Sequence, residues 1–263
     1  MEKKTAYRDV EVVYNDHGEG ICIVLLHGYL ESKEIWHSFV GLFQEGIRLI
    51  APDLPGHGIS GIWGNEHSMD DLAGSVVAVL EAEHLEKVFL VGHSMGGYVA
   101  MAFAELYPEK LLGYSLFHST CYADSDEKKN NRDREISLVL CHKKSQIINV
   151  NIPKAFADEN VERLMPEVER AKQVAHGTSE KGMIAVLHGM KGRSDRTRIL
   201  KNPDLPLLLI GGMKDNYIPV EVFEQLLLLA PHASVLRLKS SGHMGFVEEP
   251  ELAVEAIMGM VTP

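Results

Sequence analysis

The chain has 263 residues, of which 45% are hydrophobic and 24% charged, values that are typical of a soluble globular protein and exclude a disordered one. This length suits one large α/β domain with an insertion, or two modest domains. The formal net charge of −11 argues against sequence-independent binding of nucleic acid, which depends on clustered Lys and Arg, and favours a small-molecule partner.

The cysteine content and the N-terminal segment bear on where the protein resides. Cys22, Cys121 and Cys141 are an odd, sparse set without C-x-x-C spacing, which predicts reduced thiols. The first nine residues are polar and lack the apolar region of a signal peptide. No apolar run approaches the length of a membrane-spanning helix. We therefore expect a cytoplasmic protein without a membrane span.

Two apolar runs, residues 10–14 and 21–26, flank a segment rich in turn formers, which predicts two adjacent strands. The second run is continuously apolar, as in a strand of a parallel sheet that is covered on both faces. His-Gly-Tyr at residues 27–29 follows the end of this strand. The backbone N–H of Tyr29 is our candidate for one donor of an oxyanion hole.

Residues 48–51 predict the next strand, which leads into a loop dense in Pro and Gly. We expect Asp53 and His57 in this loop to hydrogen-bond to nearby backbone and not to bind a metal. Ser68, with Asp71 three residues later, resembles a capping box, and apolar residues follow at helical spacing. A helix therefore returns the chain to the next strand.

A Gly-x-Ser-x-Gly motif lies between a strand and a helix. Residues 88–91 predict a buried strand, and the small and apolar residues after the motif predict a helix. Ser94 thus lies in a sharp turn, where Gly92 and Gly96 have no side chain to collide with their neighbours. The N–H of Met95, in the first helical turn, is placed to stabilise an oxyanion. The segment predicts a nucleophile elbow.

The composition changes after the next predicted strand, residues 111–117. From 119 to 202 the chain is charged and helical, with no convincing strand, which predicts a helical cap inserted into a core of residues 1–118 and 203–263. We interpret the charged run 126–134 as a solvated helix face. The helices that we expect in the insertion are residues 126–143, 158–165, 166–176 and 179–190.

Beyond the insertion, two loops carry further candidate residues. Asp215 is the first acid after the predicted strand 205–210, and His243 follows the predicted strand 234–238. The carboxyl ends of parallel strands meet at one edge of an open α/β sheet, where ligands bind. Ser94, Asp215 and His243 therefore stand at the same edge, in the order serine, acid, histidine. Two helices complete the expected elements, residues 219–229 and 250–260.

These residues and motifs resemble the α/β-hydrolase fold family, in the branch with a helical cap between the sixth and seventh strands. The resemblance implies a doubly wound, mostly parallel sheet. It also implies Ser94 as nucleophile, His243 as general base, Asp215 as the acid that orients it, and the N–H groups of Tyr29 and Met95 as the oxyanion hole. The matching segments are residues 27–29, 53–60, 92–97, 212–215 and 242–251.

Three features of the sequence bear on which members of the family this chain resembles. Asp124 is an alternative position for the acid, which some members of the family use. The loop after Gly28 lacks the HGGG run of some lipases and esterases. Ser94 stands where the haloalkane dehalogenases of the family carry Asp, which argues against that activity.

The leading hypothesis is a serine hydrolase that cleaves carboxylic esters of small or medium acyl groups through an acyl-enzyme. The alternatives are a thioesterase or a carbon–carbon bond hydrolase on the same residues, or a ligand-binding protein without turnover. The scattered histidines and the lack of H-E-x-x-H predict no metal, and we expect no cofactor. By position, the candidate pocket residues are Trp36, Trp63, His118, Ile218 and Met244.

Overall fold

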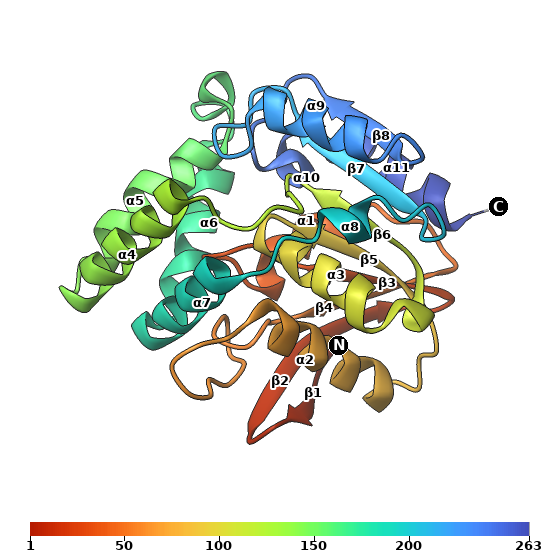
Figure 1. Cartoon of the computed structure of the whole chain (residues 1–263), viewed down its shortest axis with the longest axis horizontal. Helices are drawn as coiled ribbons and strands as arrows, with labels where there is room; N and C mark the ends of the chain where they lie inside the picture. The colour runs from red at the N-terminus through yellow and green to blue at the C-terminus, as the bar shows by residue number, and fades with distance from the viewer. Residues whose placement is uncertain (263) are drawn as a thin grey trace.

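The computed structural model describes residues 1–262. The strands within that range are β1 (Glu2–Tyr7), β2 (Val10–Gly18), β3 (Ile21–Leu26), β4 (Ile47–Pro52), β5 (Val88–His93), β6 (Leu111–Phe117), β7 (Leu207–Gly212) and β8 (Ser234–Leu238). They form one sheet in the order β1-β2-β4-β3-β5-β6-β7-β8 (Figure 1). β1, β2 and β4 pair antiparallel, and all other neighbours pair parallel. The predicted mostly parallel sheet is confirmed.

Helices cover both faces of this sheet, which explains the continuous apolar run of β3. Cys22, Val24 and Leu26 pack in a cluster with α2 and α3, and Ile23 and Leu25 pack in a second cluster with α11. Successive side chains of a strand point to opposite faces, so both faces of β3 are apolar. The helices of the core are η1 (Lys33–Trp36), α1 (His37–Val40), α2 (Met69–Ala82), α3 (Met95–Leu106), η2 (Pro108–Lys110), α9 (Val220–Leu229), α10 (Gly245–Glu248) and α11 (Pro250–Val261).

The segment between β6 and β7 is helical. Its elements are α4 (Asp126–Leu140), α5 (Lys144–Ala155), η3 (Asp158–Asn160), α6 (Met165–Gly177), α7 (Glu180–Gly192) and α8 (Thr197–Leu200). α4 to α7 gather on one side of the sheet, at the left in Figure 1. The predicted all-helical insertion is therefore part of the fold.

Glycines let α7 lie directly against the loop that precedes α2. A Cβ atom at Gly182 would lie 2.0 Å from the carbonyl oxygen of Gly56, and one at Gly189 would lie 1.7 Å from that of His67. The N–H of His67 donates to the carbonyl of Ala185, 3.0 Å away. This backbone contact fixes the insertion on the core.

The connection between β2 and β3 differs from the sequence-based expectation. We expected the two apolar runs to be adjacent strands, but β4 lies between them. β2 continues to Gly18, and the chain turns with positive φ at Gly18 and Gly20. Cβ atoms at these glycines would lie within 2.3 Å of the carbonyl oxygens of Ile47 and Gly46, so the turn packs tightly beside the start of β4. The expectation of adjacent strands was wrong because this turn carries the chain past β4.

Two of the expected helices have other boundaries. The helix expected over residues 126–143 ends at Leu140, and α5 begins separately at Lys144 after a left-handed residue, His142, with φ 56°. The helix expected over 158–165 is only the short η3. By contrast, α2 begins as expected, because the Ser68 hydroxyl accepts the N–H of Asp71 at 3.1 Å.

The loop after β4 meets one of two expectations. Asp53 is buried and accepts hydrogen bonds from the backbone N–H groups of Lys33 (2.7 Å) and Ile59 (3.0 Å). The ring nitrogens of His57, although buried, have no hydrogen-bond partner among residues 1–262. Asp53 therefore shapes the loop through its side chain, whereas the imidazole of His57 adds no hydrogen bond to it in the described chain.

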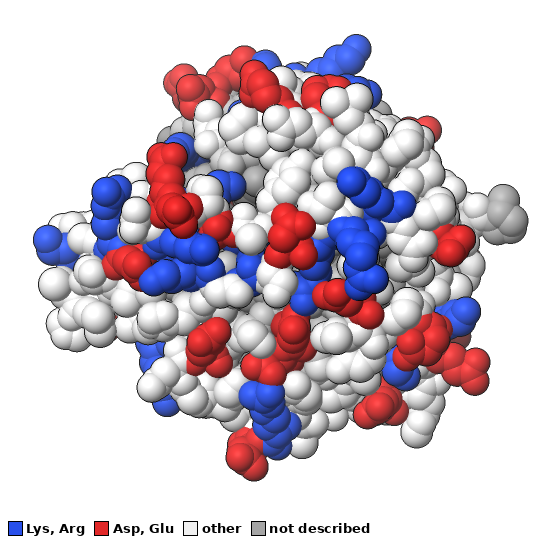
Figure 2. Space-filling view, viewed as in Figure 1, with Lys and Arg blue, Asp and Glu red and all other residues white. Residues whose placement is uncertain are grey.

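The surface carries charges of both signs. On the face in Figure 2, Lys and Arg are interspersed with Asp and Glu, including over the helical insertion.

Across the described residues, no helix combines the length and apolar character needed to cross a membrane. Cys22, Cys121 and Cys141 are free thiols.

Candidate active site

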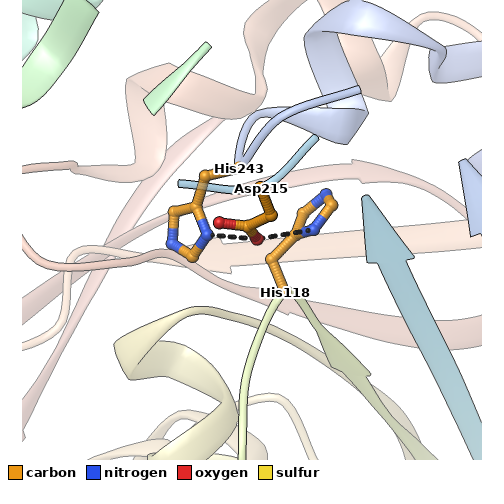
Figure 3. A group of neighbouring side chains, drawn as sticks. All are labelled: His118, Asp215 and His243. Atoms are coloured by element: carbon orange, nitrogen blue, oxygen red, sulfur yellow. Dashed lines mark hydrogen bonds and ion pairs between the residues drawn. The ribbon is translucent and has the colours of Figure 1, made fainter. Parts of the chain in front are cut away.

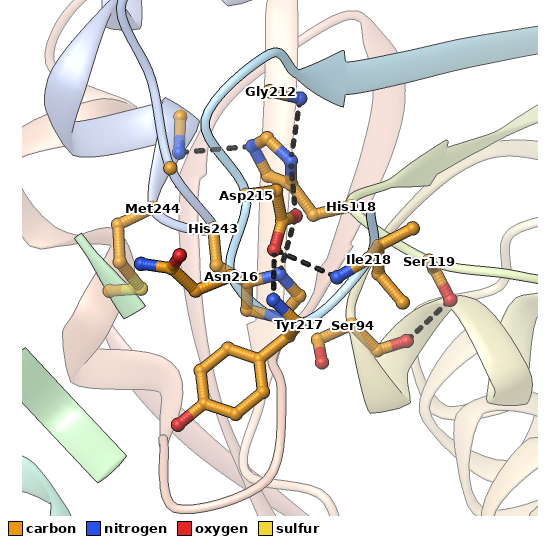
Figure 4. A network of polar contacts seen from close by, with 12 residues as sticks. Ser94, His118, Ser119, Gly212, Asp215, Asn216, Tyr217, Ile218, His243 and Met244 are labelled. Carbon is orange, nitrogen blue, oxygen red and sulfur yellow. Dashed lines mark hydrogen bonds and ion pairs between the residues drawn. The ribbon is translucent and has the colours of Figure 1, made fainter. Parts of the chain in front are cut away.

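Ser94 lies in a strained turn between β5 and α3. Its backbone angles, φ 50° and ψ −112°, are unusual for a residue with a side chain. The turn is held at both ends of the residue: the N–H of Ser94 donates to Phe117 at 2.9 Å, and its carbonyl accepts the hydroxyl of Ser119 at 2.6 Å (Figure 4). The neighbouring strand β6 thus fixes the conformation that exposes Ser94 beyond the sheet.

The glycines around Ser94 are required by close backbone contacts. A Cβ atom at Gly92 would lie 2.4 Å from the carbonyl oxygen of Gly96, and one at Gly96 would lie 2.2 Å from that of Leu26. At Gly97 the added atom would meet the Ser119 hydroxyl at 2.3 Å. The sequence motif therefore reflects the packing of β3, β5 and α3, as we expected for Gly92 and Gly96.

The two N–H groups predicted for an oxyanion hole have no competing acceptor. Met95 is the first residue of α3, and Tyr29 lies in the turn after β3. Neither backbone N–H donates a hydrogen bond to any group in the described part of the chain. Both donors are therefore available, and Met95 has the positive end of the α3 dipole behind it.

His243 and Asp215 meet beyond the ends of β8 and β7. The Nδ1 atom of His243 lies 2.8 Å from Oδ2 of Asp215 (Figure 3). The proton on Nδ1 faces the carboxylate, which leaves Nε2 as the acceptor. Within residues 1–262, no hydrogen bond joins the Ser94 hydroxyl to His243, although both residues line one pocket. Such contacts are often long before substrate binds.

The Asp215 carboxylate is fully engaged by donors. Its Oδ1 accepts the N–H groups of Tyr217 (2.7 Å) and Ile218 (2.9 Å) (Figure 4). Its Oδ2 lies between His243 and His118, whose Nδ1 is 3.2 Å away. Burial alone would raise the pKa of Asp215, but the charge of His243 and the two imidazole hydrogen bonds hold that pKa well below its ordinary value. Asp215 is therefore held in place and stays ionised.

His118 lies behind Asp215, where its ring links three strand-end loops. Its Nδ1 is 3.1 Å from the N–H nitrogen of Gly212, and its Nε2 accepts the N–H of Gly245 at 3.1 Å. A proton on Nδ1 satisfies Asp215 and Gly245, whereas the other tautomer satisfies Gly212 alone, so we assign the proton to Nδ1. Burial lowers the pKa of His118 to about 4, and Asp215 opposes this shift only in part. The ring is therefore neutral at pH 7.

His118, Asp215 and His243 also form a group that could hold a metal, with donor atoms within 4.8 Å of one another. Both imidazole Nδ1 atoms, however, lie at hydrogen-bond distance from the same carboxylate oxygen. A metal ion there would have to replace both hydrogen bonds. The geometry favours proton-mediated contacts.

Ser94 lies in a pocket with a volume of about 390 Å³. Of the candidate pocket residues, Ile218 and Met244 line it, whereas Trp36, Trp63 and His118 do not, within the chain as described. Trp36 is fully buried against Phe246, with ring centroids 4.5 Å apart. Trp63 packs on His67, with centroids 4.2 Å apart, and His118 is behind Asp215. Core packing accounts for the two tryptophans, and polar contacts behind Asp215 account for His118.

The sequence analysis missed a polar wall of the pocket. Lys128, Asn131, Arg132 and Glu135 of α4 line it, although we interpreted residues 126–134 as a solvated face. These residues follow the spacing i, i+3, i+4, i+7 and so share one face of the helix. The spacing was visible in the sequence, but nothing there indicated that this face meets Ser94.

A second missed feature is a buried ion pair in the pocket lining. His93 Nδ1 lies 2.9 Å from Oε2 of Glu31, and His93 Nε2 donates to the carbonyl of His243 at 2.8 Å. Burial opposes a charge on His93, but Glu31 raises the pKa of this imidazole. The same Glu31 oxygen accepts the N–H of Gly28. The pair thus ties the loops of Ser94, His243 and Gly28 together.

Glu248 connects the His243 loop to the helical insertion. Its Oε1 accepts the N–H groups of Gly242 (2.8 Å) and Met244 (3.2 Å), on either side of His243. Its Oε2 accepts the N–H of Ala157 (2.9 Å) and the side-chain amide of Asn160 (2.7 Å). One buried carboxyl group therefore fixes the His243 loop against the insertion.

Asp124, the alternative acid, is occupied elsewhere. Its Oδ2 accepts Nε of Arg132 at 3.2 Å, and its Oδ1 accepts Nη1 of Arg193 at 2.5 Å. The Nδ1 of His243 is already bound to Asp215. The geometry favours Asp215 as the partner of His243.

Comparisons with known proteins show the family of the chain. A family model described as "Alpha/beta hydrolase family" matches residues 23–256. A pimeloyl-[acyl-carrier protein] methyl ester esterase of Yersinia enterocolitica is 29% identical, over 92% of this chain and 93% of its own. The dihydrolipoyllysine-residue acetyltransferase component of the acetoin cleaving system of Pseudomonas putida is 28% identical, over 88% of this chain, which spans only 61% of that protein.

Among solved structures, a thermophilic esterase from Thermogutta terrifontis, with malate bound, superimposes with a TM-score of 0.93. It is 28% identical, over 98% of this chain and 97% of its own. The family model covers most of the chain. The chain belongs to the alpha/beta hydrolase family of enzymes.

Proposed function

We propose that the protein is a serine hydrolase that cleaves carboxylic esters of small or medium acyl groups through an acyl-enzyme. One observation carries the proposal: a serine in a strained turn shares a pocket with a histidine whose Nδ1 is held 2.8 Å from a buried carboxylate. The esterase names of the Yersinia and Thermogutta relatives support the ester class.

In the proposed first half-reaction, Nε2 of His243 takes the proton of the Ser94 hydroxyl as its oxygen attacks the ester carbonyl carbon. Asp215 keeps the imidazole in the tautomer with a free Nε2 and stabilises the imidazolium that forms. The imidazolium then gives its proton to the leaving alcohol. Ser94 is left acylated.

The oxyanion of each tetrahedral intermediate accepts the N–H groups of Tyr29 and Met95. These donors are fixed by the folded backbone, so they need little reorganisation as charge develops. In the second half-reaction His243 activates a water molecule, which attacks the acyl carbon and releases the acid. Loss of one such donor costs roughly 10²–10³ in turnover in comparable enzymes.

We also propose that residues 119–202 act as a cap on the core of residues 1–118 and 203–263. Residues of α4 and α5 line the pocket that contains Ser94. Its volume of about 390 Å³ is at the low end of small-molecule sites, which span roughly 300–1,000 Å³. This size supports small or medium acyl groups.

A fluorophosphonate probe tests the nucleophile. We expect covalent labelling of Ser94, located by peptide mass spectrometry, and none in a Ser94→Ala variant or in heat-unfolded protein. Full esterase activity of Ser94→Ala would reject the proposal. Measuring kcat/KM on p-nitrophenyl esters, acyl thioesters and dienone substrates then ranks ester cleavage against the thioesterase and carbon–carbon alternatives.

A further inference from the structure

The pocket wall that α4 forms is polar. Lys128, Asn131, Arg132 and Glu135 line the pocket from one face of α4, while Ile136 of the same helix is buried in the core. Lys154 of the next helix, α5, also lines the pocket. Acyl-binding sites are mostly apolar, so a continuous polar helix face is suited to a polar part of the substrate.

Arg132 has free donors at this wall. Its Nε donates to Asp124, which holds the guanidinium in place, and its side chain is 20% exposed. Its two terminal nitrogens make no hydrogen bond within residues 1–262. A guanidinium with two free terminal amino groups can bind a carboxylate through two parallel hydrogen bonds.

Two lysines add positive charge near the pocket. Lys128 lies one helical turn before Arg132, and Lys154 places its Nζ 5.2 Å from the ring centre of Tyr217, another lining residue. Both lysine residues are exposed, and neither forms an ion pair with any described residue. An anion bound here would therefore not compete with carboxylates of the protein for these lysines.

The acidic residues of the pocket offset this charge only in part. Glu31 is bound by His93 and by the N–H of Gly28. Glu135 has a buried Oε1 without a hydrogen-bond partner in the described chain, and burial raises its pKa against the opposing effects of Tyr29 and Arg132. The wall is thus cationic in a chain whose net charge is −11.

From this wall we infer that the substrate carries a second, ionised carboxylate, as in a half-ester of a dicarboxylic acid, which binds to Arg132. Lys128 and Lys154 attract the anion to the pocket, and Ser94 attacks the ester group at the other end of the molecule. The inference rests on the proposed ester hydrolysis and names its substrate class.

Monomethyl succinate and dimethyl succinate test the inference, because they share the reacting methyl ester and differ in charge. The readout is the ratio of their kcat/KM values, which does not depend on the amount of active protein. In Arg132→Gln we expect the ratio of the anionic to the neutral ester to fall by roughly 10- to 100-fold. In Lys128→Gln and Lys154→Gln it falls by roughly two- to fivefold, less at high salt.

Lys129→Gln is the matched control. It removes the same charge from the same helix, but Lys129 does not line the pocket within the described residues, so the ratio stays at the wild-type value. An unchanged ratio in Arg132→Gln overturns the inference. If that variant does not fold, an unchanged ratio in the Lys128→Gln/Lys154→Gln double variant does so.

The outcomes for the two proposals are distinct. If hydrolysis depends on Ser94 but the ratio of kcat/KM for the anionic and the neutral ester does not depend on Arg132, only the carboxylate inference is rejected. Hydrolysis that persists in Ser94→Ala rejects the serine-hydrolase function itself. Calorimetric titration with succinate needs no turnover. We expect succinate to bind to Ser94→Ala and to bind more weakly to the Ser94→Ala/Arg132→Gln double variant.

Discussion

Replacement of His118 by asparagine isolates the contribution of the second imidazole on Asp215. His118 has φ 50°, a left-handed conformation that asparagine tolerates better than most residues, so His118→Asn adds little backbone strain. The substitution removes the ring that contacts Asp215 and Gly245. Its effect therefore reports these contacts.

The expected loss of stability follows from those contacts. A hydrogen bond to a charged group contributes roughly 1.5–3 kcal/mol, and a buried N–H left unpaired, here that of Gly245, costs roughly 1–3 kcal/mol. The free energy of unfolding should therefore fall by roughly 3–5 kcal/mol at pH 7, which lowers Tm by roughly 10 °C for a chain of this size.

The pH dependence separates His118 from a general packing defect. Its pKa is about 4 in the folded state, against an ordinary value near 6.5. Between these values the unfolded chain binds a proton that the native ring does not bind, so the contribution of His118 is present above pH 6.5 and is lost as the pH falls towards 4. The loss amounts to roughly 3 kcal/mol. His27, His57 and His67, whose pKa values burial also lowers, act in the same direction in both proteins.

Urea unfolding of wild-type protein and His118→Asn at several pH values between 7.5 and 4 measures this difference. We expect the gap in unfolding free energy between the two proteins to narrow as the pH falls. If the difference in unfolding free energy stays constant or widens, the pKa of His118 is not lowered in the folded protein.

Three further predictions concern the framework of the site. In Gly92→Ala the added Cβ would lie 2.4 Å from the Gly96 carbonyl oxygen, so we expect little folded protein, measured by circular dichroism and soluble yield. Glu248→Gln loses acceptors for the N–H groups beside His243, so the free energy of unfolding, measured by urea titration, should fall by roughly 2–4 kcal/mol. The control Glu251→Gln, at an exposed site, should change it by less than about 0.5 kcal/mol. EDTA should leave esterase activity unchanged, because two imidazoles already lie at hydrogen-bond distance from the Asp215 carboxylate; a loss that zinc restores would contradict this.

The sequence predicted the parts of the fold that depend on local patterns. Continuous apolar runs indicated the parallel strands, and the glycines around Ser94 indicated a tight turn, because both signals depend on a few consecutive residues. The order of the strands did not follow from such signals. The place of β4 between β2 and β3 depends on a turn at Gly18 and Gly20 that packs on a distant segment.

The same limit explains which pocket residues were missed. Lys128 and Arg132 belong to a charged run that is typical of a solvated helix. Only the packing of α4 over the strand ends turns the face that carries them towards Ser94. His118 was expected in the pocket because it follows β6, yet its backbone turns left-handed there and its ring lies behind Asp215. A residue's place after a strand thus predicts its neighbourhood and not the direction of its side chain. That Ser94, Asp215 and His243 lie at one edge of the sheet could be predicted from the sequence, whereas the charge of the α4 face that lines the same pocket required the structure.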